Sequence, residues 1–244
     1  CATGGANAAQ CGNSAAGFEA WKREFAEEAR GRASAASLAA LMGTSYSTAT
    51  ISADRGQKSF KLSLDQFLAK RGATTIVSRG RALKRQNAAL FAQIEQRYGV
   101  PPGPLLAIWG METGFGAVRG NVNTLSAVAT LAYDCRRSAY FTDQLYAALT
   151  LVDRGMLSSS TRGAAHGEVG HTQFLPKNVL TYGTGDLNNV GAALSSTANF
   201  LKGHGWQAGA GYNPGEPNNA VFADWNKAGV YQKALALFAD KLAN

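Results

Sequence analysis

An acidic residue at the end of an apolar helical stripe constrains this chain most. Within residues 104–112, Leu105, Ile108, Trp109 and Glu112 follow the i, i+3, i+4, i+7 spacing of one helical face. A carboxyl group on that face would be partly desolvated, and desolvation raises the pKa of an acid toward the range that suits a general acid. The other interpretation, a last-turn glutamate whose side chain turns back to water, stays open from the spacing alone.

Helical spacing of apolar residues recurs along nearly the whole chain. It predicts helices around residues 18–29, 38–41, 64–68, 83–98, 104–112, 125–131, 145–152, 194–201 and 231–242. Glycines are expected to end several of these helices, among them Gly99, and Pro101-Pro102 to start the helix that carries Glu112. Residues 44–60, 154–175 and 205–219 lack such spacing and are expected to be irregular. The fold class is therefore all-α, with at most a trivial sheet.

The length and composition fit one large domain with a smaller lobe. The chain has 244 residues, 45% of them hydrophobic, and no apolar run of the roughly 18 residues that a membrane span requires. We expect residues 1–13 to be a flexible tether or signal-peptide remnant and residues 14–244 to form a single domain. Within that domain, residues 14–72 are expected to form an N-terminal helical lobe and residues 73–244 the core.

The charge balance is basic. Lys and Arg outnumber Asp and Glu by 24 to 16, which gives a formal charge of +8. Nucleic acid, an anionic membrane face and the bacterial cell wall are all polyanions that such a chain could bind. Because there is no basic run of five or six residues, and the tightest cluster, residues 79–85, fits the wet face of a helix, we do not expect nucleic acid as a partner.

Two of the three cysteines, Cys11 and Cys135, lie in polar contexts. No CxxC and no pair of histidines at metal-ligand spacing accompanies them, so we expect no metal site. A Cys11–Cys135 disulfide would require an oxidising compartment. Two free buried thiols are the other interpretation.

The third cysteine, Cys1, precedes a tract of small residues that is too poor in hydrophobes to fold. Cys1 is either the lipid-bearing first residue of a bacterial lipoprotein, or residues 6–8 (Ala-Asn-Ala) are a signal-peptide cleavage site. Both interpretations place the protein in the cell envelope, exported to the periplasm. An arbitrarily chosen chain end would explain the same residues.

Several motifs that would define a function class are absent from the sequence. It contains no GxxxxGK[ST], HExxH or GxSxG motif and no EF-hand loop. The three histidines are too scattered to predict a triad. What remains is an acid, aromatic rings, amides and a basic surface, which is the equipment of an enzyme that cleaves carbohydrate.

A series of motifs then resembles one family, in that family's order. The motifs are Tyr98-Gly99-Val100-Pro101-Pro102, Trp109-Gly110-Met111-Glu112-Thr113-Gly114-Phe115-Gly116, residues 127–133, Arg136-Arg137 with Tyr140-Phe141, residues 167–176, residues 196–206, and Trp225-Asn226 with Tyr231. Together they resemble the membrane-bound lytic murein transglycosylase B family, and the similarity spans about residues 15–242.

The resemblance implies a lysozyme-like helical core with a deep substrate groove. It also implies cleavage of the MurNAc–GlcNAc β-1,4 bond of peptidoglycan without water, which leaves a 1,6-anhydromuramoyl end. One carboxylate suffices because the C6 hydroxyl of the substrate attacks the anomeric carbon, so that one residue acts first as acid and then as base. Glu112 matches the catalytic glutamate. No cofactor is implied, peptidoglycan strands are the expected partner, and a monomer is expected.

Further positions match residues that line the groove of the family. They are Gln173, Tyr140, Asn226 and Tyr231, together with Thr113 and Phe115 beside the acid and Glu168 as a second acid that would shape the groove. Gln173 would contact sugar near the cleaved bond, although it could equally begin a helix before Pro176. Tyr231 also lies on the apolar stripe of the last helix, so a purely structural role stays open. Glu168 is flanked by glycines and is not expected to be the acid/base.

Departures from the family pattern put metal binding in doubt, and two rival functions stay open beside the implied one. The Asp/Gly-rich calcium loop of the family is shortened here to residues 181–187, which leaves too few oxygen ligands to predict Ca²⁺ binding. One rival function is a non-catalytic peptidoglycan-binding or scaffold protein. The other is a muramidase that hydrolyses the same bond.

Overall fold

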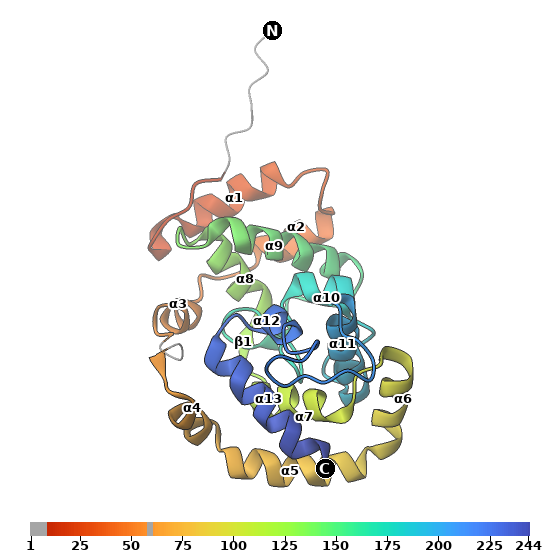
Figure 1. Ribbon diagram of the computed structural model, residues 1–244. Coiled ribbons are helices and arrows are strands. Elements are labelled where there is room, and N and C mark those ends of the chain that lie inside the picture. Colours follow the sequence, from red (N-terminus) through yellow and green to blue (C-terminus); the bar gives the residue numbers. More distant parts are fainter. Residues whose placement is uncertain (1–8, 58–60) are drawn as a thin grey trace. The chain divides into compact units, whose positions relative to one another are not determined.

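The computed structural model describes residues 9–57 and 61–244, and within these ranges nearly all of the regular secondary structure is helical (Figure 1). The α-helices are α1 (Phe18–Glu28), α2 (Ala35–Met42), α3 (Thr48–Arg55), α4 (Leu64–Arg71), α5 (Ala73–Gln86), α6 (Ala88–Tyr98), α7 (Pro102–Thr113), α8 (Thr124–Tyr133), α9 (Ser138–Asp153), α10 (Pro176–Tyr182), α11 (Val190–Gly203), α12 (Val221–Trp225) and α13 (Gly229–Ala243). A 3-10 helix, η1 (Ala15–Gly17), precedes α1, and β1 (Val122–Asn123) pairs antiparallel with β2 (Arg162–Gly163). The predicted all-α fold with a trivial sheet is confirmed.

Two sequence predictions concern the membrane: the lack of a membrane-spanning segment and the role of the N-terminal residues. No helix in the described ranges is long and apolar enough to cross a membrane. Cys1 and the other residues of 1–8, for which we predict a lipid anchor or a signal-peptide remnant, lie outside the described residues.

The helices group into two compact units, which are described separately. Unit 1 comprises Cys1–Gly56, Gly120–Val169 and Leu175–Leu180, and unit 2 comprises Gln57–Arg119, Gly170–Phe174 and Thr181–Asn244. The grouping does not follow chain order, because α8 and α9 pack with the N-terminal helices. The predicted boundary between an N-terminal lobe and a core after residue 72 stays a prediction.

Aromatic residues of α1 form much of the core of unit 1. Phe18, Trp21 and Phe25 are 1–3% exposed, and the centroids of successive rings lie 5.7 and 5.3 Å apart. Tyr133 at the end of α8 contacts Phe18 with ring centroids 5.6 Å apart. The helix predicted around residues 18–29 is confirmed, and its aromatic stripe packs against Tyr133 of α8 and Tyr146 of α9.

The segment before α1 is attached to the end of α8. A disulfide joins Cys11 to Cys135, whose Cα atoms lie 5.0 Å apart. The amide of Gly12 donates to Tyr133 O at 3.1 Å, and the Tyr133 hydroxyl donates to Ser14 O at 2.6 Å. Cys11 and Gly12, which belong to the predicted tether of residues 1–13, are thus fixed to α8 within unit 1.

We predict that breaking this disulfide destabilises the protein by about 4–5 kcal/mol. The bridge spans 124 residues, and in the chain-entropy model a loop of that length stabilises by about 4–5 kcal/mol because it restricts the unfolded chain. The measurement is urea unfolding of the wild type and of Cys11→Ser/Cys135→Ser under non-reducing conditions. Intact mass with and without alkylation checks the bridge itself, and two alkylated thiols at these positions in the folded, unreduced protein would refute it.

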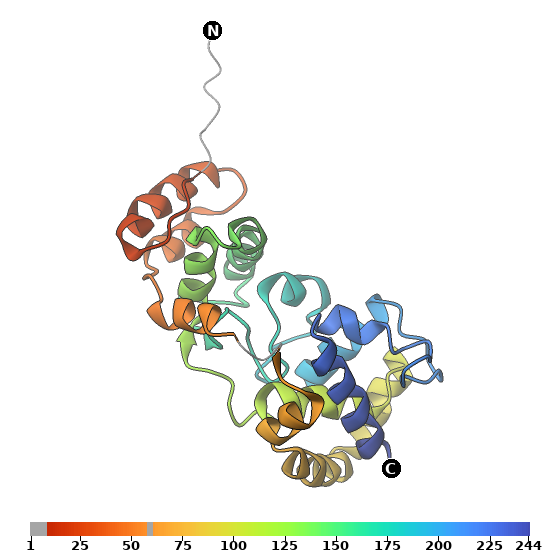
Figure 2. The ribbon, with the colours of Figure 1, turned by 60° about the vertical axis from the view of Figure 1, so that its left-hand side comes forward.

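Unit 2 is built around α7, which is buried on almost every side. Residues 103–111 and Thr113 are all buried, and α13 and α5 pack against the helix (Figures 1 and 2). Gly110 permits one of these close approaches, because a Cβ there would lie 2.8 Å from the Phe115 ring and 2.9 Å from Ile76. A helix that is apolar all round requires such a surrounding layer.

The predicted ends of α7 are confirmed. Pro101 is extended and Pro102 is the first helical residue, a position where the missing N–H of proline costs no hydrogen bond. At the other end Gly114 adopts a left-handed conformation with φ of 55°, and its amide donates to Gly110 O. These two stops place Glu112 in the last turn of the helix.

The prediction that residues 44–60 are irregular is wrong for part of that range, because Thr48–Arg55 form α3. The apolar periodicity is missing because the buried side chains of α3 are polar, namely Thr50 and Asp54. Ser47 caps the helix by accepting a hydrogen bond from the Thr50 amide. Asp54 is compensated by Arg136 and Arg137 of the same unit.

The single long helix predicted through residues 83–98 is also wrong. The chain breaks at Asn87, where φ is −113°, and α5 and α6 are separate helices. The Asn87 side chain donates to Leu83 O at 2.9 Å, so it competes with the main chain for a helical carbonyl. The apolar stripe continues across the break, which is why spacing alone does not reveal it.

Candidate active site

Near its C-terminal end, the buried helix α7 is partly exposed at Glu112. Leu105, Ile108 and Trp109 are 0–3% exposed, so the predicted apolar stripe is confirmed. Within the range 103–113, Glu112 alone keeps partial exposure. Its side chain therefore combines a desolvating surround with access for a reactant.

The pKa of the Glu112 carboxyl is raised above its ordinary value of 4.5, mainly by burial. Three groups of unit 2 oppose this effect. The Tyr231 hydroxyl donates to Glu112 Oε1 at 2.5 Å, the positive charge of Arg71 favours the carboxylate, and so does the Trp225 indole. Desolvation exceeds their sum, so the carboxyl keeps its proton to a higher pH than an exposed glutamate does.

Tyr231 is fixed as a hydrogen-bond donor to Glu112. It lies in the first turn of α13, is 4% exposed, and accepts a hydrogen bond from Trp225 Nε1 at 3.2 Å. Burial and the neighbouring Glu112 raise the pKa of the phenol well above 10. Tyr231 therefore stays protonated at any working pH and remains a hydrogen-bond donor to the carboxyl of Glu112.

Asn226 lies in a pocket beside this pair. The pocket, of about 170 Å³, is lined by Gln57, Phe67, Arg71, Asn226, Ala228, Val230 and Tyr231. Asn226 Oδ1 accepts from the Ala228 amide at 2.9 Å, and its main-chain oxygen accepts from Gln232 at 2.7 Å. The loop between α12 and α13 is thereby held, with Asn226 and Tyr231 on the same pocket.

The turn after Glu112 is locked by Thr113. The Thr113 hydroxyl donates to His171 O at 2.7 Å and accepts from the Gly116 amide at 2.8 Å. Gly116 has a φ of 86°, and a Cβ there would lie 2.2 Å from the His171 ring, so only glycine fits. Phe115 is 6% exposed and packs edge-to-face on Trp109. Thr113 and Phe115 thus lie behind the acid, in the packing that holds it.

Gln173 and Phe115 share an uncommon backbone conformation. Among the described residues they are the non-glycine positions with positive φ, at 62° and 61°. Such conformations cost free energy and persist where the surroundings impose them, often at functional sites. Gln173 Nε2 donates to Gly170 O at 2.9 Å and to Arg119 O at 3.4 Å, which orients the amide.

His171 connects the Gln173 loop to α7. Its Nδ1 accepts from Trp109 Nε1 at 3.1 Å, and its amide donates to Leu187 O at 2.9 Å. Burial lowers the pKa of the imidazole. A neutral ring is what this geometry requires, since a protonated Nδ1 could not accept from the indole.

Tyr140 and Glu168, also predicted for the site, belong to unit 1. Tyr140 is 51% exposed in the first turn of α9, with its ring 5.0 Å from Phe141. Glu168 Oε1 lies 3.6 Å from His166 Nδ1, and His166 Nε2 lies 3.2 Å from Asp54 Oδ1. Through the His166 ring, Glu168 is thus connected to Asp54 of the same unit.

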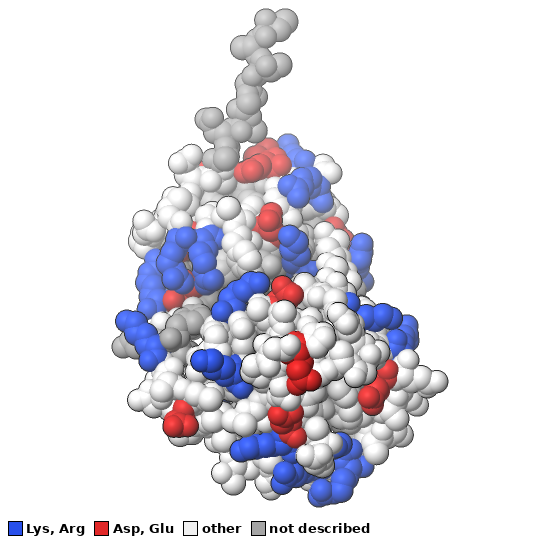
Figure 3. Space-filling view, in the orientation of Figure 1, with Lys and Arg blue, Asp and Glu red and all other residues white. Residues whose placement is uncertain are grey.

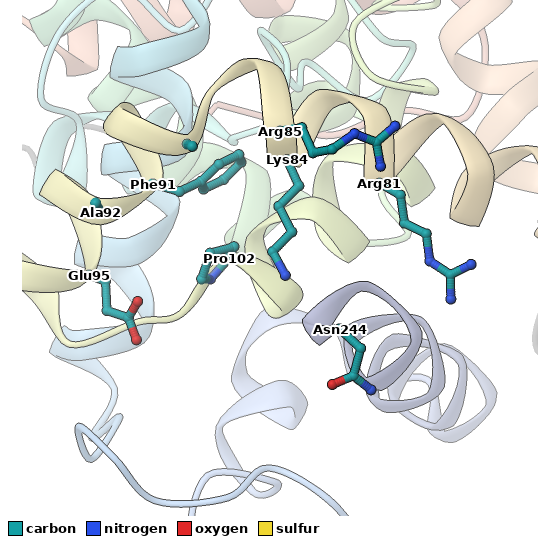
Figure 4. Close-up of a pocket in the computed structure, with 9 residues that line it drawn as sticks. Arg81, Lys84, Arg85, Phe91, Ala92, Glu95, Pro102 and Asn244 are labelled. Carbon is teal, nitrogen blue, oxygen red and sulfur yellow. The ribbon is translucent and has the colours of Figure 1, made fainter.

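A second pocket of unit 2 has a structural explanation. It measures about 450 Å³ and is lined by Arg81, Lys84, Arg85, Ala88, Phe91, Ala92, Glu95, Pro102 and Asn244 (Figure 4). Lys84 donates to Ala243 O at 2.7 Å and Arg81 to Lys241 O at 3.2 Å, so both cations cap the last turn of α13.

The described residues contain no group of three or more His, Cys, Asp or Glu side chains that could hold a metal ion. The expectation of no metal stays a prediction. Sequence reasoning missed three members of the site, Arg71, Trp225 and His171. Trp225 and His171 lie inside quoted motifs, but nothing in the pattern around Arg71 marks it.

A partly buried carboxyl with a raised pKa and a fixed phenolic donor, on a helical scaffold, is typical of an enzyme that uses a general acid. Residues 17–215 match the family described as Transglycosylase SLT domain, and the chain belongs to that family. The membrane-bound lytic murein transglycosylase B of Escherichia coli K12 is 35% identical over 139 residues. That match covers 50% of this chain and 38% of the relative, so the chain spans well under half of the curated relative's length.

Solved structures agree on the fold. SltB3 of Pseudomonas aeruginosa in complex with NAG-NAM-pentapeptide has a TM-score of 0.84 at 26% identity, over 92% of this chain and 79% of that one. SltB1 of the same organism has a TM-score of 0.81 at 21% identity, over 91% and 98%. The Escherichia coli lytic transglycosylase Slt35 in complex with calcium has a TM-score of 0.74 at 20% identity, over 97% and 96%. The last two likenesses show the shared lysozyme-like fold alone.

Because Glu112 is buried, we predict that the stability of Glu112→Gln relative to the wild type increases as pH rises. The folded-state pKa of Glu112 lies above the ordinary 4.5, so its favourable contribution is complete below about 4.5 and is lost as pH rises through the folded-state pKa. Glutamine fills the same volume and never ionises. The measurement is the free energy of unfolding from pH 4 to 8.

The control for this series is Glu95→Gln, because Glu95 is exposed. We expect Glu95→Gln to follow the wild-type curve and Glu112→Gln to rise above it toward pH 8. A Glu112→Gln protein that loses stability relative to wild type as pH rises would contradict the raised pKa.

Proposed function

We propose that the protein is a lytic murein transglycosylase that cleaves the MurNAc–GlcNAc β-1,4 bond of peptidoglycan with Glu112 as the one acid/base. The observation that carries this proposal is the hydrogen-bonded pair of Glu112 and Tyr231 at the solvent-facing end of buried α7. No carboxylate of unit 2 is among the groups that shift the pKa of Glu112. A retaining glycosidase would need a second carboxylate about 5 Å away, and an inverting one a second carboxylate to activate water.

In the proposed reaction Glu112 first gives its proton to the glycosidic oxygen, and the bond to MurNAc C1 breaks. The C6 hydroxyl of the same MurNAc then forms the new bond to C1 and returns its proton to Glu112. No water is consumed, and the product carries a 1,6-anhydro ring. The attacking hydroxyl is already part of the bound sugar, so its alignment costs little entropy.

The neighbours of Glu112 suit these two half-steps. The carboxyl must be protonated at the start, which burial favours, and must exist as a carboxylate in between, which the Tyr231 hydrogen bond and the Arg71 charge favour. We propose that Asn226, Gln173 and Tyr140 contact sugar, and that Glu168 shapes the groove. For Thr113 and Phe115, which the resemblance also places in the groove, burial behind the acid supports a role in positioning Glu112.

The substrate class is supported by the relatives. SltB3 was solved in complex with NAG-NAM-pentapeptide and in complex with NAG-anhNAM-pentapeptide. We propose that this chain takes the same kind of strand. A periplasmic or envelope location fits the Cys11–Cys135 disulfide, which persists in an oxidising compartment. The lipid anchor at Cys1 and the monomeric state remain proposals.

We predict that Glu112→Gln lowers the release of anhydro-muropeptides from purified sacculi by at least about 100-fold, within the range that general acid catalysis supplies. The readout is mass spectrometry of the digest, with Glu95→Gln as the matched carboxyl-to-amide control. Near wild-type release by Glu112→Gln would refute the assignment. Wild-type products heavier by one water would indicate a muramidase instead, and no product at all would indicate a binding or scaffold protein.

The +8 charge predicts adhesion to murein that weakens with salt. Figure 3 shows Lys and Arg spread over the visible face with Asp and Glu between them, rather than gathered in one patch. Diffuse attraction to the carboxylates of peptide stems acts over about 10 Å at 0.1 M salt. Co-sedimentation with sacculi should therefore fall steadily up to about 0.5 M salt, while cleavage of a short soluble glycan changes much less. Salt-independent co-sedimentation would mean that groove contacts hold the enzyme.

A further inference from the structure

Arg71 reaches the catalytic helix from a different element. It is the last residue of α4, and its guanidinium donates to Met111 O at 2.7 Å and lies over the Phe67 ring, 4.9 Å from the centroid. It lines the pocket shared by Asn226 and Tyr231. It also lines a third pocket, which reaches Met111 and Gly114. One side chain thus touches both the surroundings of the acid and the main chain that carries it.

The bond to Met111 O satisfies a helix end. The last four carbonyls of an α-helix lack intrahelical partners, and in α7 the Gly110, Met111 and Thr113 oxygens accept from the Gly114 amide, Arg71 and the Val118 amide. A cation at this end also complements the helix dipole. Because Met111 precedes Glu112, Arg71 fixes the peptide next to the acid.

The charge of Arg71 acts on Glu112 without a direct ion pair. The guanidinium stabilises the carboxylate form, yet the described ion pairs do not include these two groups. A direct pair would favour the carboxylate so strongly that the acid would be lost near neutral pH. Arginine does not deprotonate in proteins, so this charge is constant over the working range.

The groups that face the carboxyl come from three elements: Arg71 from α4, Trp225 from α12 and Tyr231 from α13. Two further groups lie at the same end of α7 but are bound elsewhere. Arg79 of α5 donates to Gly114 O at 3.1 Å and lies over Phe115, and neutral His171 accepts from Trp109. Arg79 therefore resembles Arg71 as a cap of the same turn, but it is not among the groups that act on Glu112.

We infer that Arg71 is a positioning residue for Glu112, which orients the acid through Met111 O and supplies a fixed positive charge that favours the carboxylate formed when the proton leaves. This inference rests on the proposed acid/base role of Glu112. It assigns Arg71 no contact with the reacting atoms. It gives Arg71 a role that Arg79 lacks, although both arginines donate to a main-chain oxygen at the end of α7.

The test is the pH dependence of kcat and KM on a soluble murein glycan for the wild type, Arg71→Gln, Arg71→Lys and Arg79→Gln. Glutamine keeps a donor for Met111 O and removes the charge, whereas lysine keeps the charge. We expect Arg71→Gln to move the alkaline limb of the profile to higher pH, because the carboxyl holds its proton longer. We also expect its kcat to fall by about 10-fold to 100-fold, since small misplacements of a catalytic group cost rate of this order, with KM little changed.

The matched variants decide the interpretation. Arg71→Lys should keep the alkaline limb at its wild-type position, and so should Arg79→Gln, even where that variant lowers thermal stability. If Arg71→Gln and Arg79→Gln give the same profile, Arg71 is only a helix cap and the inference fails. If Arg71→Gln does not fold, Arg71→Lys becomes the test variant. The inference then predicts a lowered kcat with the alkaline limb of the pH profile at its wild-type position. A moved alkaline limb or an unchanged kcat would contradict it.

A second readout does not depend on turnover. The pKa of Glu112, followed by carboxyl ¹³C NMR in glutamate-labelled protein and assigned with Glu112→Gln, should rise in Arg71→Gln and not in Arg79→Gln. A shift in this titration without any lytic activity in the wild type would retain the charge coupling and reject the proposed function. An active wild type with no shift in Arg71→Gln would reject the inference alone.

Discussion

The desolvated carboxyl of Glu112 is the interaction on which the rest of the site depends. Burial raises its pKa, and a short hydrogen bond from Tyr231 limits that rise while it fixes the orientation of the group. Neither effect alone would serve an acid that must also act as base. Burial by itself would hold the proton, whereas a strong ion pair would remove it. The site balances the two with a phenol and a guanidinium bonded to the main chain.

The fold places the carboxyl in this surround through one unusual helix. Because α7 is apolar on every face, α5 and α13 must cover it, and both bring site residues or their supports with them. α13 carries Tyr231, and the segment before it carries Trp225 and Asn226. Directly after Glu112 the chain makes a tight turn, and only glycine fits the backbone geometry at Gly116. Packing of the scaffold and chemistry of the site therefore share the same residues.

The sequence predicts the parts of this arrangement that depend on local pattern. The apolar stripe and the Pro and Gly stops of α7 follow from residue type and spacing, whereas the Cys11–Cys135 disulfide is one of two interpretations that the sequence leaves open. α3 is missed because its buried face is polar, and the break at Asn87 is missed because the apolar stripe runs through it. Arg71 is invisible to pattern reasoning, since its partner Met111 lies 40 residues further along the chain. Tertiary bonds of this kind can be found only when the two helices are seen together.

The most direct test of this account is the titration of Glu112 in the wild-type protein. Carboxyl ¹³C NMR of glutamate-labelled protein would give the pKa of Glu112, with Glu112→Gln to assign the signal. The account predicts a midpoint above the ordinary 4.5, because desolvation exceeds the effects of Tyr231, Arg71 and Trp225. A midpoint at or below 4.5 would contradict it, since Glu112 would then be an ordinary carboxylate with no proton to donate near neutral pH.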